Sequence, residues 1–485
     1  NETEERSSDF LVNDLIQRAR LLLSELEELR QRLRSLRLEG SVELAHFRGM
    51  AASECTMLEK LAAAPSDRNR AHVARSSNIP FLEHVWSCCK QSQDLLALHK
   101  RVYLPDELNP HRTDSFHSTK SKKGHKDNTV TIDVVSEGGR RWTKVSLVTN
   151  TRLLFDLAKQ GWDSSESSEE DEPVALVSPD CHDDCDIPII RTSKNLVAAS
   201  RMTRVRTRHP SIVLMLPRVQ LGVTPEVDHV IKSCRAAGVS VFCAQDLEPP
   251  PPLTAALPSM VIDPISKLTK ALNVDCTILL ALVSDLSHGK VSMEPWFSRS
   301  LQRQAEVEDT ETLLTSLLYP VLQGRPMVCT QQAAQCFRQI TDTIGTPSEK
   351  ARTVLLMGDD KSKSQGVLIE RLQDYSAHKV PINLRLPVKV VDWQEHNSQF
   401  HLPPAALAVG REMSVNNKSV FLYGWAAERT TLTSNRIIKR QIDRKLEEFQ
   451  DLPDDVWPSI WVCPIARSLV GREKRGSQRP GQKDP

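Results

Sequence analysis

Hydrophobic residues recur with helical spacing at residues 11–38. The intervals alternate between four and three, and Glu and Arg occupy the flanking positions. The apolar positions are Leu15, Ala19, Leu22, Leu26, Leu29, Leu33 and Leu36. Such a seam packs either against a second chain, in a coiled coil that supports self-association or another protein partner, or against a helix of the same chain. Three heptads are the short limit for a coiled coil, so the pattern favours packing within a helical N-terminal region at 1–125.

A period-two pattern follows in TVTIDVVSEGGRRWTKVSLV, residues 129–148, on both sides of a Gly-Gly turn. This pattern predicts a β-hairpin, and a two-residue turn places Val135 opposite Trp142 and Asp133 opposite Lys144. Restriction-endonuclease-like folds also carry an acid and a lysine on such a hairpin. Trp142 stands where that motif has a second acid, which favours a plain cross-strand ion pair between Asp133 and Lys144.

Strands and helices then alternate, with strands predicted at PSIVLMLP and GVSVFCA. This alternation predicts a small α/β domain over 126–248. An acidic, Ser-rich insertion at 162–187 has too little apolar area to order itself. The Pro-rich segment 249–259 is predicted to be a linker to the next domain.

Residues 260–470 repeat the alternation of strands and helices. Strands that alternate with helices are predicted at LNVDCT, PMVCT, SVFLYGW and SIWVCPI. The segment LRLPVKVVDW is predicted to be a strand pair or a strand with an insertion. The expected architecture is a parallel sheet between layers of helices, a three-layer α/β/α fold. The last residues, 471–485, are polar and are predicted to be a disordered tail.

The amino-acid composition limits the class of protein and its cellular location. The chain has 485 residues, 39% hydrophobic and 26% charged, as expected for a soluble protein of two or three domains. The net charge of +1 gives no overall attraction to nucleic acid or to an anionic membrane. The eleven cysteines are scattered, often within apolar segments, which indicates reduced thiols in the cytoplasm or nucleus. No apolar run is long enough for a membrane span, so no membrane association is expected.

Candidate chemistry lies where the predicted C-terminal strands end, because open α/β sheets bind ligands there. Asp275 follows LNV, Gln332 follows PMVCT, Glu428 follows SVFLYGW, and Asn435 opens the next helix. Several converging oxygen ligands would be needed for Mg²⁺- or Mn²⁺-assisted phosphodiester cleavage. The alternative for Asp275 is a simple cap of the helix that begins at Cys276.

Several segments together resemble a eukaryotic family, domain-of-unknown-function family 1308, whose members carry a C-terminal PIN-like domain. The segments are LNVDCTILLALVSDLSHG, the 129–148 hairpin, and CTQQAAQCFRQITDTIG followed by SEKAR. The resemblance implies an α/β/α fold, and active PIN domains are Mg²⁺- or Mn²⁺-dependent ribonucleases. It also implies that Asp275 is the first acidic ligand, that Gln332 replaces a Glu, and that Asn435 matches the pattern's Asn. Glu428 is the nearest substitute for the third acid, at a shifted spacing.

Gln332 keeps an oxygen but removes a negative charge, so the expected site is degenerate, with weak metal binding through Asp275, Gln332 and Glu428. The segment RIIKRQIDRK places Arg436, Lys439, Arg440 and Arg444 on a helix beside this site, where they could contact RNA phosphates. The first hypothesis is a nucleic-acid-binding or scaffolding protein without strong catalysis. The alternatives are an active ribonuclease using Asp275, Glu428 and Asn435, and an interaction protein built on the leucine seam.

Overall fold

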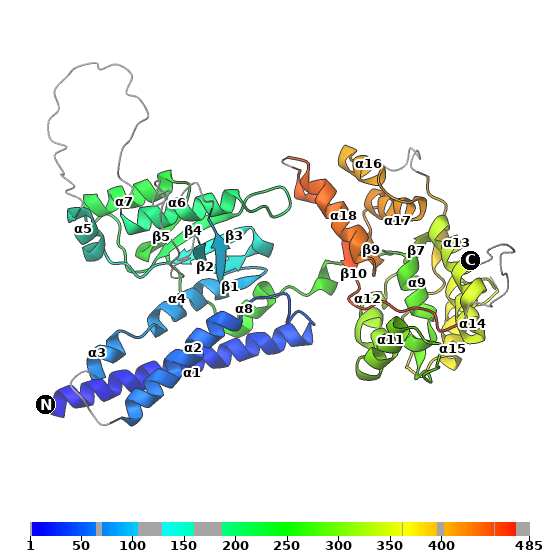
Figure 1. Cartoon of the computed structure of the whole chain (residues 1–485), viewed down its shortest axis with the longest axis horizontal. Helices are drawn as coiled ribbons and strands as arrows, with labels where there is room; N and C mark the ends of the chain where they lie inside the picture. Colours follow the sequence, from blue (N-terminus) through cyan, green and yellow to red (C-terminus); the bar gives the residue numbers. More distant parts are fainter. Residues whose placement is uncertain are drawn as a thin grey trace, which may run out of the picture. The chain divides into compact units, whose positions relative to one another are not determined.

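The computed structural model describes residues 2–64, 70–104, 129–159, 187–360, 362–394, 402–450 and 452–471. The chain divides into two compact units, Asn1–Asp263 and Pro264–Pro485, here called the N-terminal and C-terminal units (Figure 1). Apart from their edge residues, Ile187 and Gly471, the predicted acidic insertion and the predicted tail lie outside the described residues. No helix in these ranges is both long and apolar enough to cross a membrane.

The N-terminal unit begins with four helices and continues with a mixed α/β segment. Its elements are α1 (Glu2–Ser35), α2 (Ala45–Ala63), α3 (Arg70–Arg75), α4 (Ile79–Lys90), β1 (Ala97–Tyr103), β2 (Thr129–Ser136), β3 (Arg141–Val145), α5 (Asn150–Ala158), α6 (Pro188–Arg201), β4 (Ser211–Leu216), α7 (Pro225–Ala236), β5 (Ser240–Cys243) and α8 (Leu253–Met260). The sheet order is β1-β2-β3-β4-β5. The pairs β1/β2 and β2/β3 are antiparallel, and the other two pairs are parallel.

The leucine seam of α1 is buried within its own unit. Its positions from Leu15 to Leu33 are at most 3% exposed, and α1 packs against α2, α3 and α4. The apolar stripe that a coiled coil would use is therefore already covered by neighbouring helices. The structure agrees with the second interpretation of the seam, in which α1 packs against helices of the same chain.

The predicted hairpin register is confirmed, because Val135 pairs with Trp142 across β2 and β3. Two predicted boundaries were wrong. The helical region does not end at residue 125, since β1 lies inside it and pairs with β2. The segment 249–259 is not a bare linker, since Leu253 opens α8, whose apolar face joins the core formed by α1 and α4.

The C-terminal unit alternates strands and helices throughout. Its elements are β6 (Leu272–Val274), α9 (Cys276–Val283), α10 (Asp285–His288), α11 (Arg299–Thr310), α12 (Tyr319–Leu322), β7 (Met327–Thr330), α13 (Gln331–Ile344), α14 (Pro347–Met357), α15 (Gln365–Asp374), β8 (Lys389–Val391), α16 (Pro404–Gly410), α17 (Val415–Ala426), β9 (Thr430–Thr433), α18 (Arg436–Glu447) and β10 (Ile460–Val462). All the strand pairs are parallel, in the order β10-β9-β6-β7-β8, and helices flank the sheet as predicted (Figure 1).

One predicted strand was wrong, and the error moves a candidate residue. The segment SVFLYGW lies inside the helix α17, and the strand is the following TTLT, which forms β9. All seven residues of SVFLYGW are buried. A short, fully buried apolar run cannot be assigned to strand or helix from its periodicity, because every face of the element is apolar.

Candidate functional site

The strand order of the C-terminal unit reverses between β6 and β9. From β6 the chain adds β7 and β8 on one side, and then places β9 and β10 on the other. In open parallel sheets, ligands bind beyond the carboxyl ends of the strands at such a reversal. Asp275 directly follows β6 and Ser434 directly follows β9, so both residues lie at this edge of the sheet.

The side chain of Asp275 connects the ends of these two strands. Its Oδ2 accepts hydrogen bonds from the hydroxyl groups of Thr277, at 2.8 Å, and Thr433, at 2.7 Å. Asp275 stands at the N-cap position of α9, where its carboxylate binds these two hydroxyl groups and makes no regular side-chain cap bond. The residue is only 2% exposed. Burial raises the pKa of Asp275, while the hydrogen bonds from Thr433 and Thr277 oppose that shift.

Asn435 is linked to the same carboxylate through the two threonines. Its backbone N–H donates to Thr433 Oγ1 at 3.0 Å, and the N–H of Ser434 donates to Thr277 Oγ1 at 3.0 Å. The side-chain Oδ1 of Asn435 accepts from the N–H of Ile438 at 3.2 Å and so caps α18. The structure therefore brings Asp275 and Asn435 together, but the amide oxygen of Asn435 is already used.

Gln332 lies at the same edge of the sheet. It is the second residue of α13, which directly follows β7, the neighbour of β6. Its Oε1 is buried and accepts no hydrogen bond within the described part of the chain. Gln332 thus keeps a polar oxygen at this edge without the charge that a Glu would have.

Glu428 lies at the opposite end of the sheet from Asp275. It is exposed, in the turn between α17 and β9, and therefore precedes the strand instead of following it. The four residues of β9 separate the two carboxylates by roughly 13 Å along the strand. The structure does not bring Glu428 into the predicted group.

The donor set at this edge fits a divalent cation poorly. Among the described residues, no group of three or more His, Cys, Asp and Glu side chains could hold a metal ion. The edge offers one buried carboxylate, Asp275, whose Oδ2 already accepts two hydroxyl groups. Mg²⁺ and Mn²⁺ prefer several oxygen ligands with carboxylates among them, so a stable metal shell needs more charge than these residues supply.

The basic residues of α18 divide into paired and unpaired members. Lys439 forms an ion pair with Asp443, and Arg436 donates to the carbonyl oxygen of Pro464 at 2.7 Å. Arg440 and Arg444 are exposed, and neither has a carboxylate partner in the described ranges. One face of α18 is therefore basic and free to make contacts, and the opposite, apolar face packs into the core.

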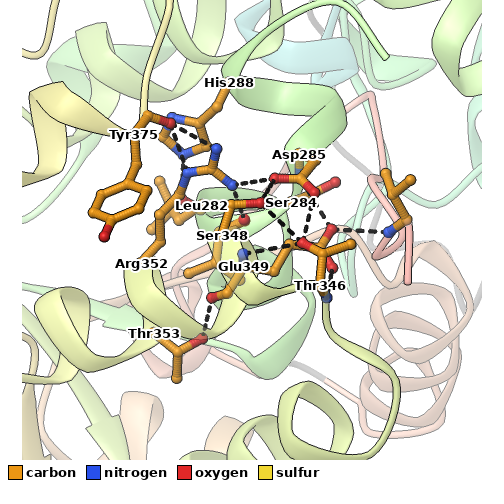
Figure 2. Close-up of polar contacts among 12 residues, drawn as sticks. Leu282, Ser284, Asp285, His288, Thr346, Ser348, Glu349, Arg352, Thr353 and Tyr375 are labelled. Carbon is orange, nitrogen blue, oxygen red and sulfur yellow. Dashed lines mark hydrogen bonds and ion pairs between the residues drawn. The ribbon is translucent and has the colours of Figure 1, made fainter. Parts of the chain in front are cut away.

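A second polar cluster, which the sequence patterns did not single out, lies at the other end of α9 (Figure 2). Asp285 accepts hydrogen bonds from Ser348 Oγ and Thr346 Oγ1, each at 2.6 Å, and pairs with the guanidinium of Arg352 at 2.6 Å. Burial raises the pKa of Asp285, but these hydrogen bonds outweigh it and the net shift is downward. The Arg352 guanidinium also donates to the carbonyl oxygens of Val283 and Tyr375.

The same cluster contains a capping box at the start of α14 (Figure 2). The Thr346 hydroxyl accepts the N–H of Glu349, and Glu349 Oε2 accepts the N–H of Thr346. Glu349 Oε1 also accepts the N–H groups of Asp285 and Val470. His288 is buried nearby, and burial with the nearby positive charge of Arg352 lowers its pKa to about 3. The carboxylates of Asp285 and Glu349 already accept hydrogen bonds from groups of the same chain. We therefore assign the cluster a role in stabilising the fold.

Comparison with known families gives a match within the C-terminal unit. Residues 272–365 match the family described as a protein of unknown function, DUF1308. The matched DUF1308 segment includes Asp275, Gln332 and the Asp285–Arg352 pair, and ends before β9 and α18. No solved structure matches the chain.

Proposed function

We propose that the C-terminal unit binds single-stranded RNA at the carboxyl edge of its sheet and does not cleave it. The observation that carries this proposal is the exposed basic face of α18, which begins at the edge where the strand order reverses. Arg436, Arg440 and Arg444 follow at four-residue intervals, so they line one side of the helix about 6 Å apart along its axis. Such a row suits contacts with successive phosphates of a flexible strand.

An apolar contact accompanies these charges. Ile437 lies next to Arg436 on α18 and is 76% exposed. An exposed aliphatic side chain between arginines offers a surface for an unstacked base, and single-stranded nucleic acid presents such bases. This combination favours a single strand over a duplex, whose base edges are less accessible.

We expect no cleavage because the carboxyl edge of the sheet has too little negative charge to hold a catalytic metal ion. Metal-assisted hydrolysis needs several carboxylates that converge on one or two ions. Asp275 follows β6 at this edge, and its Oδ2 already accepts hydrogen bonds from two hydroxyl groups. We expect the C-terminal unit to bind RNA with little or no turnover.

The test is fluorescence anisotropy with a short labelled single-stranded RNA and the full chain. The double variant Arg440→Glu/Arg444→Glu should raise the Kd by roughly tenfold or more and reduce the dependence of binding on salt. Arg371→Glu is the matched control, because Arg371 is an exposed arginine on another helix, α15. Equal affinity of the double variant and the wild type would overturn the proposal.

The same samples distinguish binding from cleavage. With Mg²⁺ or Mn²⁺ added, the labelled RNA should keep its length on a denaturing gel. Cleavage by the wild type that is lost in Asp275→Asn would instead support the ribonuclease alternative. Circular dichroism of each variant shows whether it remains folded.

A further inference from the structure

A cavity of about 500 Å³ lies in the N-terminal unit, between β1 and the connection from α1 to α2. Its apolar wall includes Leu33, Leu44 and Leu98, which are buried. Its polar wall consists of Arg30, Glu39, Glu43, His46, Arg48 and His99. Cavities of this size with an apolar body and a few polar groups are typical of small-molecule sites.

The backbone of His99 is strained. His99 has φ +57° in the middle of β1, a left-handed conformation that is unfavourable for a residue other than glycine. Its neighbours Leu98 and Lys100 keep the pairing with β2, so the sheet continues on both sides. Strain of this kind is concentrated at functional sites, because the side chain is held where the regular backbone would not place it.

His99 lies against a buried ion pair. Asp133 is fully buried, and it accepts from the Lys144 ammonium at 3.2 Å and from the N–H of Val145 at 2.8 Å. His99 Nδ1 lies 3.7 Å from Asp133 Oδ1, is buried, and has no hydrogen-bond partner in the described residues. Lys144 already balances the charge of Asp133. The Nδ1 edge of the imidazole faces Asp133, and His99 is also one of the residues that line the cavity.

With both imidazoles neutral, the two glutamates of the cavity wall balance its two arginines, but ion pairs occupy both carboxylates. Glu39 pairs with Arg30 and Arg34, and Glu43 pairs with Lys100. Arg48 is exposed and has no carboxylate partner in the described parts of the chain. The imidazole of His46 lies 4.9 Å from that of His99, measured between ring centroids, so two imidazoles and one unpaired guanidinium border the same space.

We propose that this cavity binds a small phosphate ester of about the size of a mononucleotide. Donors that come from Arg48, His46 and His99 match the several oxygens of a phosphate better than the two oxygens of a planar carboxylate. The apolar wall formed by Leu33, Leu44 and Leu98 covers the organic part of the ligand. The proposal is independent of RNA binding, since it concerns the other unit and other residues.

Isothermal titration calorimetry of the full chain tests the proposal with uridine monophosphate, uridine and inorganic phosphate as probes. Uridine monophosphate should bind saturably, inorganic phosphate more weakly, and uridine weakest. Arg48→Ala should weaken binding of the monophosphate by about tenfold or more, the value expected for a charge-assisted contact. Arg75→Ala, an exposed arginine on α3, should leave it unchanged.

A second variant excludes loss of folding as the explanation. Glycine adopts positive φ at little cost, so His99→Gly should be at least as stable to heat as the wild type and yet bind the monophosphate more weakly. Equal binding of uridine and its monophosphate would overturn the proposal. So would unchanged affinity in both Arg48→Ala and His99→Gly, or no saturable binding of any of the three probes.

Discussion

Ionising the buried carboxylate of Asp275 costs folding free energy. Its side chain is buried, and burial raises its pKa above the ordinary value of 3.8. A raised pKa in the folded state means that the group favours folding at low pH, below its unfolded pKa. That contribution is lost as the pH rises through the folded pKa. A residue that costs stability at neutral pH is better explained by function than by packing.

This cost predicts the effect of Asp275→Asn on stability. An amide has nearly the shape of the carboxylate, and its oxygen can accept from Thr277 and Thr433 in the same way. The variant should therefore equal or exceed the wild type in melting temperature at pH 7. The advantage should shrink as the pH falls below 7, because protonation of Asp275 removes the difference. Thermal melts of both proteins over a series of pH values measure it.

Asp275→Ala is the comparison that separates charge from hydrogen bonding. Alanine leaves two buried hydroxyl groups without their acceptor, which costs on the order of 1–3 kcal/mol. It should therefore be less stable than Asp275→Asn at every pH. A lower melting temperature of Asp275→Asn than of the wild type at pH 7 would contradict this account of the buried charge.

An ion pair and hydrogen bonds join α14 to the residues at the end of α9. Arg352 is 5% exposed, and its guanidinium joins Asp285 to two backbone carbonyl groups (Figure 2). Removing one member of a buried, hydrogen-bonded ion pair leaves the other uncompensated. The contacts therefore matter more for stability than those of an exposed pair of the same chemistry.

Arg352→Met should destabilise the C-terminal unit by roughly 3 kcal/mol. The matched control is Arg338→Met, which removes an arginine from the ion pair with Asp359, where both side chains are 37% exposed. That control should cost less than about 1 kcal/mol, because water screens the exposed pair. Urea denaturation followed by circular dichroism compares the two variants. Similar losses in both would show that burial does not set the strength of the Asp285–Arg352 pair.

Elements with an alternating or amphipathic pattern were predictable from the sequence, and the buried apolar run inside α17 was not. The hairpin of β2 and β3 and the amphipathic α18 were predicted correctly, since one face of each is polar. The apolar segment of α17 was misassigned as a strand, which placed Glu428 at the wrong end of β9. The pair Asp285–Arg352 joins residues 67 positions apart, so no local pattern shows it. The Thr346–Glu349 capping box could have been found from its spacing.

The two hydrophobic cores of the N-terminal unit and those of the C-terminal unit do not share residues. The core residues of the first unit lie between Val12 and Val261, and those of the second lie between Leu272 and Val470. Each set is continuous in sequence and belongs to its own sheet. A core that is contained in one stretch of chain can form without the rest, which is the usual property of a domain.

The fragment 264–485 should therefore fold by itself, with a cooperative thermal transition measured by circular dichroism. Its melting temperature should match one of the transitions of the full chain, and Arg352→Met should lower that transition in both proteins. The fragment should also keep the RNA affinity assigned to α18, since Arg440 and Arg444 lie within it. A fragment that is unfolded on its own, or that melts without cooperativity, would mean that the C-terminal core depends on the N-terminal unit. The RNA-binding surface would then have to be sought in the whole chain.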